Sequence, residues 1–145
     1  ARILLGKQQE LALGNLDARR DFGYAPEYMA ALANMADRES GDDYVLATGH
    51  AASVREFASA AFAAIDMPIE WQGHAAAEIG REVKSGEVRV RIDTRLLRPV
   101  DAPLLVGNAG KARKQLGFDP QIDLHELTRR MVEADLQRER NGRPG

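Results

Sequence analysis

The densest group of chemistry-bearing residues lies at positions 14–24, where a glycine–asparagine turn precedes two arginines and an aspartate. Glycine lets a backbone approach a ligand closely, and Asn15 stands at that turn. Arg19 and Arg20 carry planar guanidinium forks that match the oxygens of a phosphate, and Asp21 is expected to fix one fork by a charge-assisted hydrogen bond. The pattern indicates an anion site. The alternative, which composition alone favours, is an ordinary loop with a solvated Arg–Asp pair.

Several catalytic classes lack their residues in this sequence. The absence of cysteine excludes disulfides, thiolate catalysis and cysteine-ligated metal sites. Dinucleotide and Walker A glycine motifs, a G-x-S-x-G elbow and a Tyr-x-x-x-Lys pair are also absent. His50, His74 and His125 have no neighbour at metal-ligand spacing. We therefore expect this chain to supply no catalytic, cofactor-binding or metal-binding residue.

Length and charge narrow the remaining classes. A chain of 145 residues suits one domain, and 44% hydrophobic with 29% charged residues is an ordinary globular balance. A net charge of -2 argues against a nucleic-acid partner. No apolar stretch approaches the ~18 residues of a membrane span, and no signal-peptide pattern opens the chain. The composition predicts a soluble cytoplasmic domain without a membrane partner.

The elements that must position these residues are short. The segment 2–6 reads like the last turn of a helix closed by glycine, so the chain is expected to begin in the middle of a fold. Apolar runs and period-two alternation predict strands at 11–13, 44–48, 69–71 and 87–93. Helices are expected after Pro26, from Val54, over 111–116 and from Leu124. The polar stretch 72–86 is expected to be a surface excursion.

Helical spacing also predicts which side chains are buried. The first helix is expected to bury Met29, Leu32, Ala33 and Ala36. The second opens with a Ser53–Glu56 capping box and carries a stripe of Val54, Phe57, Ala61, Ala64 and Ile65. The last opens with a capping box at 123–126 and carries Leu124, Leu127, Met131 and Ala134 on one face. Short strands with packed helices indicate an α/β fold over 1–137, followed by a frayed polar tail at 138–145.

Residues 13–28 closely resemble a segment of the GDP-mannose 4,6-dehydratases, L-G-N-L-D-A-K-R-D-W-G-Y/H-A-x-[ED]-Y. Further segments match in order, D-Y-V-x-A-T-G at 43–49 and S-V-R-E-F at 53–57 among them. The residues around Trp71 and Gly80, the strand and R-P loop at 88–99, and positions 107–135 complete the likeness, which covers roughly residues 3–136.

The resemblance implies an extended short-chain dehydrogenase/reductase that uses NADP. Such an enzyme oxidises C4 of GDP-mannose, eliminates water across C5–C6 and returns the hydride to C6. The product, GDP-4-dehydro-6-deoxy-D-mannose, leads to GDP-fucose and GDP-rhamnose. In that family the NADP-binding Rossmann domain and the catalytic residues precede the matched region. The chain is therefore expected to be the smaller C-terminal, GDP-sugar-binding part of a homo-oligomeric enzyme, and to be inactive alone.

The resemblance also assigns four substrate-binding residues. Arg20 and Arg98 match the pair that embraces the diphosphate, and Asp101 falls on the acid of R-P-x-E with a side chain one methylene shorter. Asn15 lies where a backbone turn passes along the nucleoside. Leucines at 96 and 97 replace a usual aromatic pair, so a drifted or inactive substrate site stays open.

Two alternatives remain at this point. One is the substrate domain of a related sugar-nucleotide epimerase, dehydratase or reductase. The other is a free-standing, non-catalytic module that binds a nucleotide or a partner protein. The segment at 15–18 favours the GDP enzyme, whereas the missing dinucleotide motif supports the free-standing module for the chain as it stands.

Overall fold

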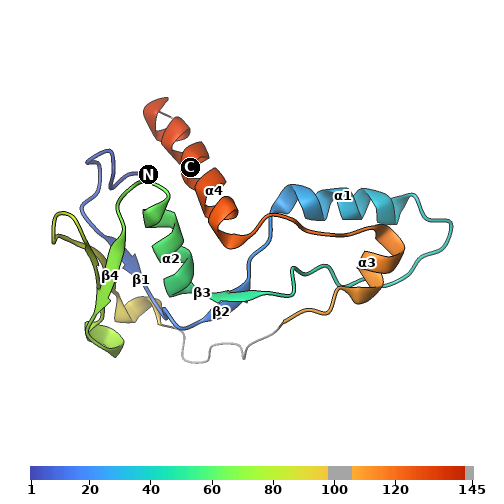
Figure 1. Cartoon of the computed structure of the whole chain (residues 1–145), viewed down its shortest axis with the longest axis horizontal. Helices are drawn as coiled ribbons and strands as arrows, with labels where there is room; N and C mark the ends of the chain where they lie inside the picture. Colours follow the sequence, from blue (N-terminus) through green and yellow to red (C-terminus); the bar gives the residue numbers. More distant parts are fainter. Residues whose placement is uncertain (98–105, 143–145) are drawn as a thin grey trace.

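A four-stranded mixed sheet lies at one end of the molecule, and a pair of helices lies at the other end (Figure 1). The computed structural model describes residues 1–97 and 106–142. The sheet order is β1-β6-β5-β4, with β1 parallel to β6 and the other pairs antiparallel. The strands are β1 (Leu11–Leu13), β4 (Ile69–Gln72), β5 (Ile79–Glu82) and β6 (Val88–Ile92). The predicted strands at 11–13, 69–71 and 87–93 are confirmed, as is the fold class of short strands with packed helices.

The prediction of a surface excursion over 72–86 is wrong, because β5 lies inside this stretch as an inner strand of the sheet. The sequence of β5 does not resemble a strand, because one of its positions is a glycine that allows close packing and another is a glutamate that forms a charge pair. Gly80 faces Val90 and the Trp71 ring, where a Cβ would come within 3.1–3.2 Å of both. The buried Glu82 carboxylate accepts a hydrogen bond from Arg89 Nε at 2.9 Å. Only a short 3-10 turn, Ala75–Ala77, interrupts the path from β4.

Helix α2 (Val54–Ala63) packs between the sheet and α4. The predicted capping box is present: Ser53 Oγ accepts from the Glu56 N–H at 3.1 Å, and a Glu56 oxygen accepts from the Ser53 N–H at 2.6 Å. Ala58, Ala60 and Phe62 are its buried residues, whereas Ala64 of the predicted stripe is exposed. Because the sheet and α4 cover α2 on two sides, its buried residues do not lie along the single stripe that the sequence predicts.

Helix α4 (Leu124–Arg140) begins at Asp123, whose carboxylate accepts from the Glu126 N–H at 2.8 Å. The reciprocal half of the predicted box is replaced, because the Glu126 carboxylate accepts from Arg129 and Arg130. Leu127 is buried as expected, but Met131 is 47% exposed. The sequence gives no sign that Thr128 is fully buried; its hydroxyl donates to a carbonyl one turn back.

The chain ends of this region are tied together. Gly6 adopts a left-handed φ of 68°, and its N–H donates to the Ile3 carbonyl while Lys7 N–H donates to the Arg2 carbonyl. The predicted glycine closure is therefore present, but residues 2–7 form a turn and no helix is assigned there. Lys7 Nζ also binds the Glu139 carboxylate at 2.9 Å. Helix α4 itself runs to Arg140, past the expected boundary at 137.

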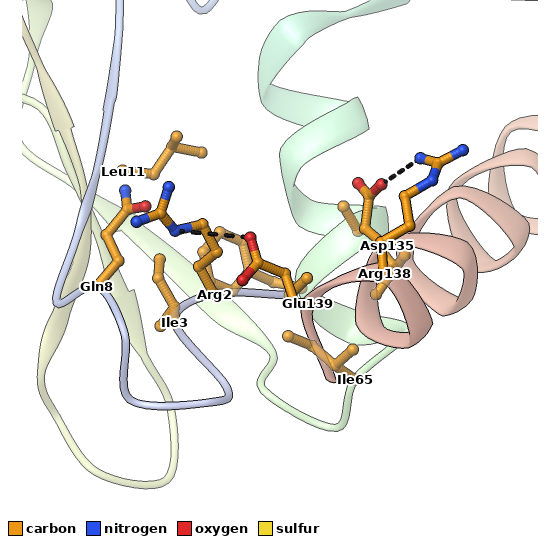
Figure 2. Close-up of a pocket in the computed structure, with 12 residues that line it drawn as sticks. Arg2, Ile3, Gln8, Leu11, Ile65, Asp135, Arg138 and Glu139 are labelled. Carbon is orange, nitrogen blue, oxygen red and sulfur yellow. Dashed lines mark hydrogen bonds and ion pairs between the residues drawn. The ribbon is translucent and has the colours of Figure 1, made fainter. Parts of the chain in front are cut away.

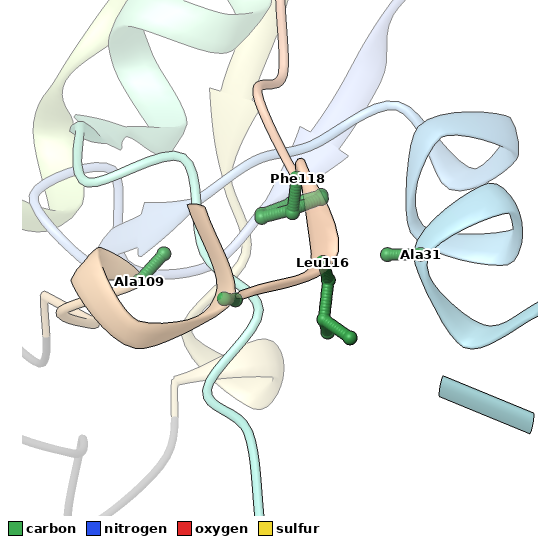
Figure 3. Close-up of a cluster of buried hydrophobic side chains, with 5 residues drawn as sticks. Ala31, Ala109, Leu116 and Phe118 are labelled. Atoms are coloured by element: carbon green, nitrogen blue, oxygen red, sulfur yellow. The ribbon is translucent and has the colours of Figure 1, made fainter. Parts of the chain in front are cut away.

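Helix α1 (Ala25–Ala36) begins at the expected proline but turns the unexpected face inward. Met29 and Leu32, predicted to be buried, are 57% and 43% exposed. The buried core instead joins Ala31 to α3 (Gly110–Leu116) and to Phe118 (Figure 3), and its members are Ala31, Ala109, Ala112, Leu116 and Phe118. Both faces of α1 are apolar, so periodicity alone did not decide between them. The predicted glycine closure of α3 is confirmed at Gly117, with φ 66°.

The stretch 44–48 is not assigned to a strand within the described residues, which corrects the prediction made from its apolar run. Its Ala47 is buried against Gly107, where any Cβ would collide. The apolar residues indicated that this stretch is covered, but hydrophobicity does not determine whether another strand pairs with it. A separate antiparallel ribbon, β2 (Arg19–Asp21) with β3 (Ala51–Ser53), lies between the two ends of the molecule (Figure 1).

Candidate functional site

Two loops meet at the carboxyl edge of β1 and β6. Because these strands are parallel, with Leu13 opposite Ile92, the loop that follows each strand leaves the sheet at the same edge. The Asp93 N–H donates to the Leu13 carbonyl at 2.8 Å. Gly14 lies so close to Leu96 that a Cβ would stand 2.6 Å from its carbonyl oxygen. A glycine is therefore required there, and the loops 14–18 and 93–97 are in direct contact.

The first loop is anchored on α2. Asn15 forms an Asx turn, its Oδ1 accepting from the Asp17 N–H at 3.0 Å. Leu16 is 3% exposed, and its carbonyl accepts from the Arg55 N–H at 3.0 Å. The Ala18 carbonyl accepts from Val54 N–H at the same distance. The loop thus satisfies first-turn donors of α2 and presents Asn15 at its exposed tip.

Arg55 is a positioning residue that the sequence reasoning missed. Its Nε and Nη2 each donate to the Glu78 carboxylate at 2.9 Å, and Nη1 donates to Asp17. These two carboxylates raise the pKa of Arg55 above its usual value. The guanidinium also lies 5.8 Å from the centre of the Trp71 ring. Its partners are distant in sequence, so no local spacing could have revealed this brace of the loop.

Arg20 lies in β2, opposite Ala52 of β3, and its Nη1 donates to the Arg19 carbonyl at 2.7 Å. Asp21, which the sequence predicts to fix one of the two arginines, has Thr48 and Gly49 as its partners in the described hydrogen bonds. Its carboxylate accepts from Thr48 Oγ1 at 2.5 Å and from the Gly49 N–H at 3.0 Å. Successive strand residues point to opposite faces, so Asp21 is directed away from its neighbour Arg20.

The second loop begins with a local ion pair. The Asp93 carboxylate caps the 3-10 turn Thr94–Leu96 by accepting from the Arg95 N–H at 3.0 Å, and it also binds the Arg95 guanidinium. These bonds lower the pKa of Asp93 to about 2. Leu97 follows and is 42% exposed. The two remaining predicted site residues, Arg98 and Asp101, lie outside the described residues.

Neither Asn15 nor Arg20 lines either of two pockets in the described part of the chain. One, of about 550 Å³, lies between the N-terminal turn, α2 and α4 (Figure 2). It has apolar walls and rim pairs of Arg2 with Glu139 and Arg138 with Asp135. The other, of about 440 Å³, lies beside β3 and the start of α4, where Arg113 donates to the Thr48 carbonyl.

Within residues 1–97 and 106–142, no group of three histidine, cysteine or acidic side chains can hold a metal ion. None of the helices in that part is both long and apolar enough to cross a membrane.

Comparison with known proteins assigns the family. The sequence model of GDP-mannose 4,6 dehydratase matches residues 1–131. The chain belongs to the GDP-mannose 4,6-dehydratase family. The GDP-mannose 4,6 dehydratase of Drosophila melanogaster is 44% identical to it over 137 residues, covering 94% of this chain and 35% of that protein. The family resemblance seen in the motifs is thereby confirmed.

Solved structures share the fold at low identity. The UDP-glucose 4-epimerase of Bifidobacterium longum, in complex with NAD+ and UDP, superposes with a TM-score of 0.70 at 18% identity, over 99% of this chain and 39% of that one. RMD from Pseudomonas aeruginosa, complexed with NADPH, gives 0.68 at 18% identity, over 91% and 38%. Curated dehydratase relatives are also much longer, since the chain spans 26–40% of their length.

Proposed function

We propose that this chain is the GDP-sugar-binding region of a GDP-mannose 4,6-dehydratase. The observation that carries the proposal is the contact of two loops at the carboxyl edge of β1 and β6. One loop holds Asn15 and continues into β2 with Arg20, and the other is followed in the sequence by Arg98 and Asp101. Open sheets of α/β proteins bind ligands at such an edge.

Each proposed residue has a role that its chemistry supports. The guanidinium groups of Arg20 and Arg98 bind the diphosphate, because two planar forks can share its several oxygens. Asp101 accepts hydrogen bonds in the hexose pocket, and Asn15 lies along the nucleoside. None of these groups transfers a proton in the proposal. The four residues bind and orient the sugar nucleotide. Arg55 and Asp21 hold the surrounding backbone in place.

The nicotinamide cofactor does not fit this chain. Its sequence contains no glycine-rich dinucleotide motif. In the proposal a Rossmann part of the full-length enzyme would hold NADP, which would supply the redox chemistry of the reaction. That enzyme is a cytoplasmic homo-oligomer that makes GDP-4-dehydro-6-deoxy-D-mannose for GDP-fucose or GDP-rhamnose synthesis. The chain by itself is inactive.

A fusion protein tests the proposal. The part of the Drosophila relative that precedes its matched region is joined ahead of this chain, and conversion of GDP-mannose is followed by product analysis. We expect turnover by the fusion protein, none by the chain alone, and no saturable NADPH binding by the chain alone. A fusion protein that is folded and binds NADPH but neither binds nor converts GDP-mannose would contradict the proposed function.

A further inference from the structure

The ribbon that carries Arg20 is short and depends on support from its surroundings. β2 and β3 pair over three residues of each strand, with Arg20 opposite Ala52. A two-stranded ribbon of this size is at best marginally stable in water. One end of the ribbon is held by α2, because the Ala18 carbonyl accepts from the Val54 N–H at 3.0 Å. The position of the Arg20 backbone therefore depends on what holds the other end.

The other end is held by Thr48, which lies just before β3 in the chain. Its hydroxyl donates to the Asp21 carboxylate at 2.5 Å, and its backbone N–H donates to the same carboxylate oxygen at 3.2 Å. The Gly49 N–H donates to the second oxygen at 3.0 Å. Asp21 is the last residue of β2 and lies opposite Ala51. Three donors from one short turn thus close this end of the ribbon.

Thr48 is also bound to α3. Its carbonyl accepts from the Arg113 guanidinium at 3.1 Å. Ala47 beside it is buried against Gly107, where a Cβ would stand 2.4 Å from the Ala47 side chain. Figure 1 shows the chain before β3 running from α3 to the ribbon. The hydroxyl, N–H and carbonyl of Thr48 together connect α3 to the residue that follows Arg20.

We infer that Thr48 is a positioning residue for the phosphate contact of Arg20, and that Arg113 acts on this contact through Thr48. The inference rests on the proposed function, in which Arg20 binds the diphosphate. A guanidinium group binds oxygens strongly only within a narrow range of distance and angle. Release of the ribbon at Asp21 would let the β2 backbone move, and the guanidinium would then meet the phosphate less often in that geometry. Thr48 and Arg113 do not contact the nucleotide themselves.

A purely structural role of Thr48 would have a different signature. A loss of stability lowers the folded fraction, which weakens the binding of every ligand of the folded chain by the same factor. A loss of position at Arg20 weakens the binding only of ligands that carry phosphate. Guanosine has the nucleoside of GDP without its phosphates, so the ratio of the two affinities separates the two roles.

NMR titration of GDP and of guanosine into the chain and its variants measures this ratio. Thr48→Val removes the hydroxyl at nearly constant size and should weaken GDP binding about tenfold, within the range of coupling between contacting residues. Guanosine binding should not change. Thr48→Ser keeps the hydroxyl and should restore GDP binding. Arg113→Ala should weaken GDP binding about threefold, the effect of one hydrogen bond, and Arg113→Lys should weaken it less.

Two further variants serve as controls. Asp123→Ala removes another carboxylate that accepts from a backbone N–H, at the start of α4, and should leave the ratio of the two affinities unchanged. In an Arg20→Ala background, Thr48→Val should have no further effect on GDP binding, because the contact that it positions is gone. Equal losses for GDP and guanosine in Thr48→Val overturn the inference, and so does a full further loss in the Arg20→Ala background.

Hydrogen exchange tests the same connection without a nucleotide. Exchange of the amides over residues 19–21 and 51–53 should become about tenfold faster in Thr48→Val and stay native in Thr48→Ser. Unchanged exchange in Thr48→Val overturns the positioning role even in a chain that binds GDP. Faster exchange in Thr48→Val, with no GDP binding by the unmutated chain, contradicts the proposed function and leaves the hold of Thr48 on the ribbon standing.

Discussion

Two units of the molecule are stabilised differently. The sheet unit consists of β1, β4, β5, β6, α2 and α4. The α1–α3 unit consists of α1, α3 and residues 44–48. The sheet unit packs Phe62, Met67 and Val90 together, with Trp71 against them. The α1–α3 unit has a core of mostly alanines and exposes Met29. The first covers its own apolar surface to a greater extent. Among the described residues, hydrogen bonds from Asn34 and to Glu27 hold the second in place, and Met29 and Leu32 stay exposed.

Truncating one core residue in each unit gives the largest expected effect. Phe62→Ala should cost about 3–5 kcal/mol of unfolding free energy, because it leaves a cavity beside Val90. Leu116→Ala should cost about 2 kcal/mol, at the low end of the usual range, because three of the four other residues of its core are alanines and offer it few contacts to lose. Urea unfolding followed by hydrogen exchange measures both. Equal loss of protection in the sheet unit from the two variants would mean that the units share one cooperative core.

Removing the brace of the first loop should give the next largest effect. Arg55→Ala leaves the 12% exposed Glu78 side chain without its bidentate partner and should cost about 1–3 kcal/mol. Adding Glu78→Gln should recover part of that loss, because a neutral amide is easier to leave unpaired. Urea unfolding of the single and double variants measures this. A double variant less stable than Arg55→Ala would show that Glu78 has another role.

The two units also differ in how their helices begin. Helix α2 has a complete capping box, whereas the residue before α1, Tyr24, makes no capping side-chain bond. Ser53→Ala should therefore cost the sheet unit about 1 kcal/mol, and Ser53→Thr much less because it keeps the hydroxyl. Thermal unfolding compares the variants. An equal loss for threonine would point to packing around the 6% exposed Ser53 rather than to the cap.

The smallest expected effect is a local titration in the second loop. Hydrogen bonds from Arg95 lower the pKa of Asp93 to about 2 in the folded chain, against about 3.9 in an unfolded one. A lowered folded pKa stabilises the fold above about pH 4, and this contribution disappears as the pH falls towards 2. NMR titration of the carboxyl carbon should show the low value in the native chain and a nearly ordinary value in Arg95→Ala. Identical values would show that the pair does not form in solution.

Much of the sheet unit was predictable from sequence because its patterns are local. Alternation at 87–93 and the Ser53–Glu56 box each lie within one element and are confirmed. The strand Ile79–Glu82 was missed, since a glycine chosen for a close approach and paired charges both read as loop.

The α1–α3 unit and the candidate site depended on information that spacing does not hold. The inward face of α1 is chosen by contacts with residues near 116–122, far along the chain. The hydrogen-bond partner of Asp21, Thr48, is also distant in the sequence and could not be found from local spacing. The glycine at 14 indicated a close backbone approach to a ligand, whereas the approach that the folded chain shows is that of Gly14 to Leu96.

In the proposed function, the loops leaving β1 and β6 bind one diphosphate together. Arg20→Ala and Arg98→Ala should each weaken GDP binding by roughly 1.5–3 kcal/mol, the range for hydrogen bonds to a charged group. Lysine at either position should restore only part, because an ammonium has no planar fork. GDP and GDP-mannose should lose affinity equally, since neither arginine contacts the hexose in this account.

Calorimetric titration of GDP into the unmutated chain, the two alanine variants and the double variant is the most direct measurement. We expect each single variant to lose affinity for GDP. The loss in the double variant should be less than additive, because both guanidinium groups hold the same small anion. Native affinity in Arg98→Ala would contradict it. The loop after β6 would then not contribute to the diphosphate site, and its contact with Gly14 would serve only the fold.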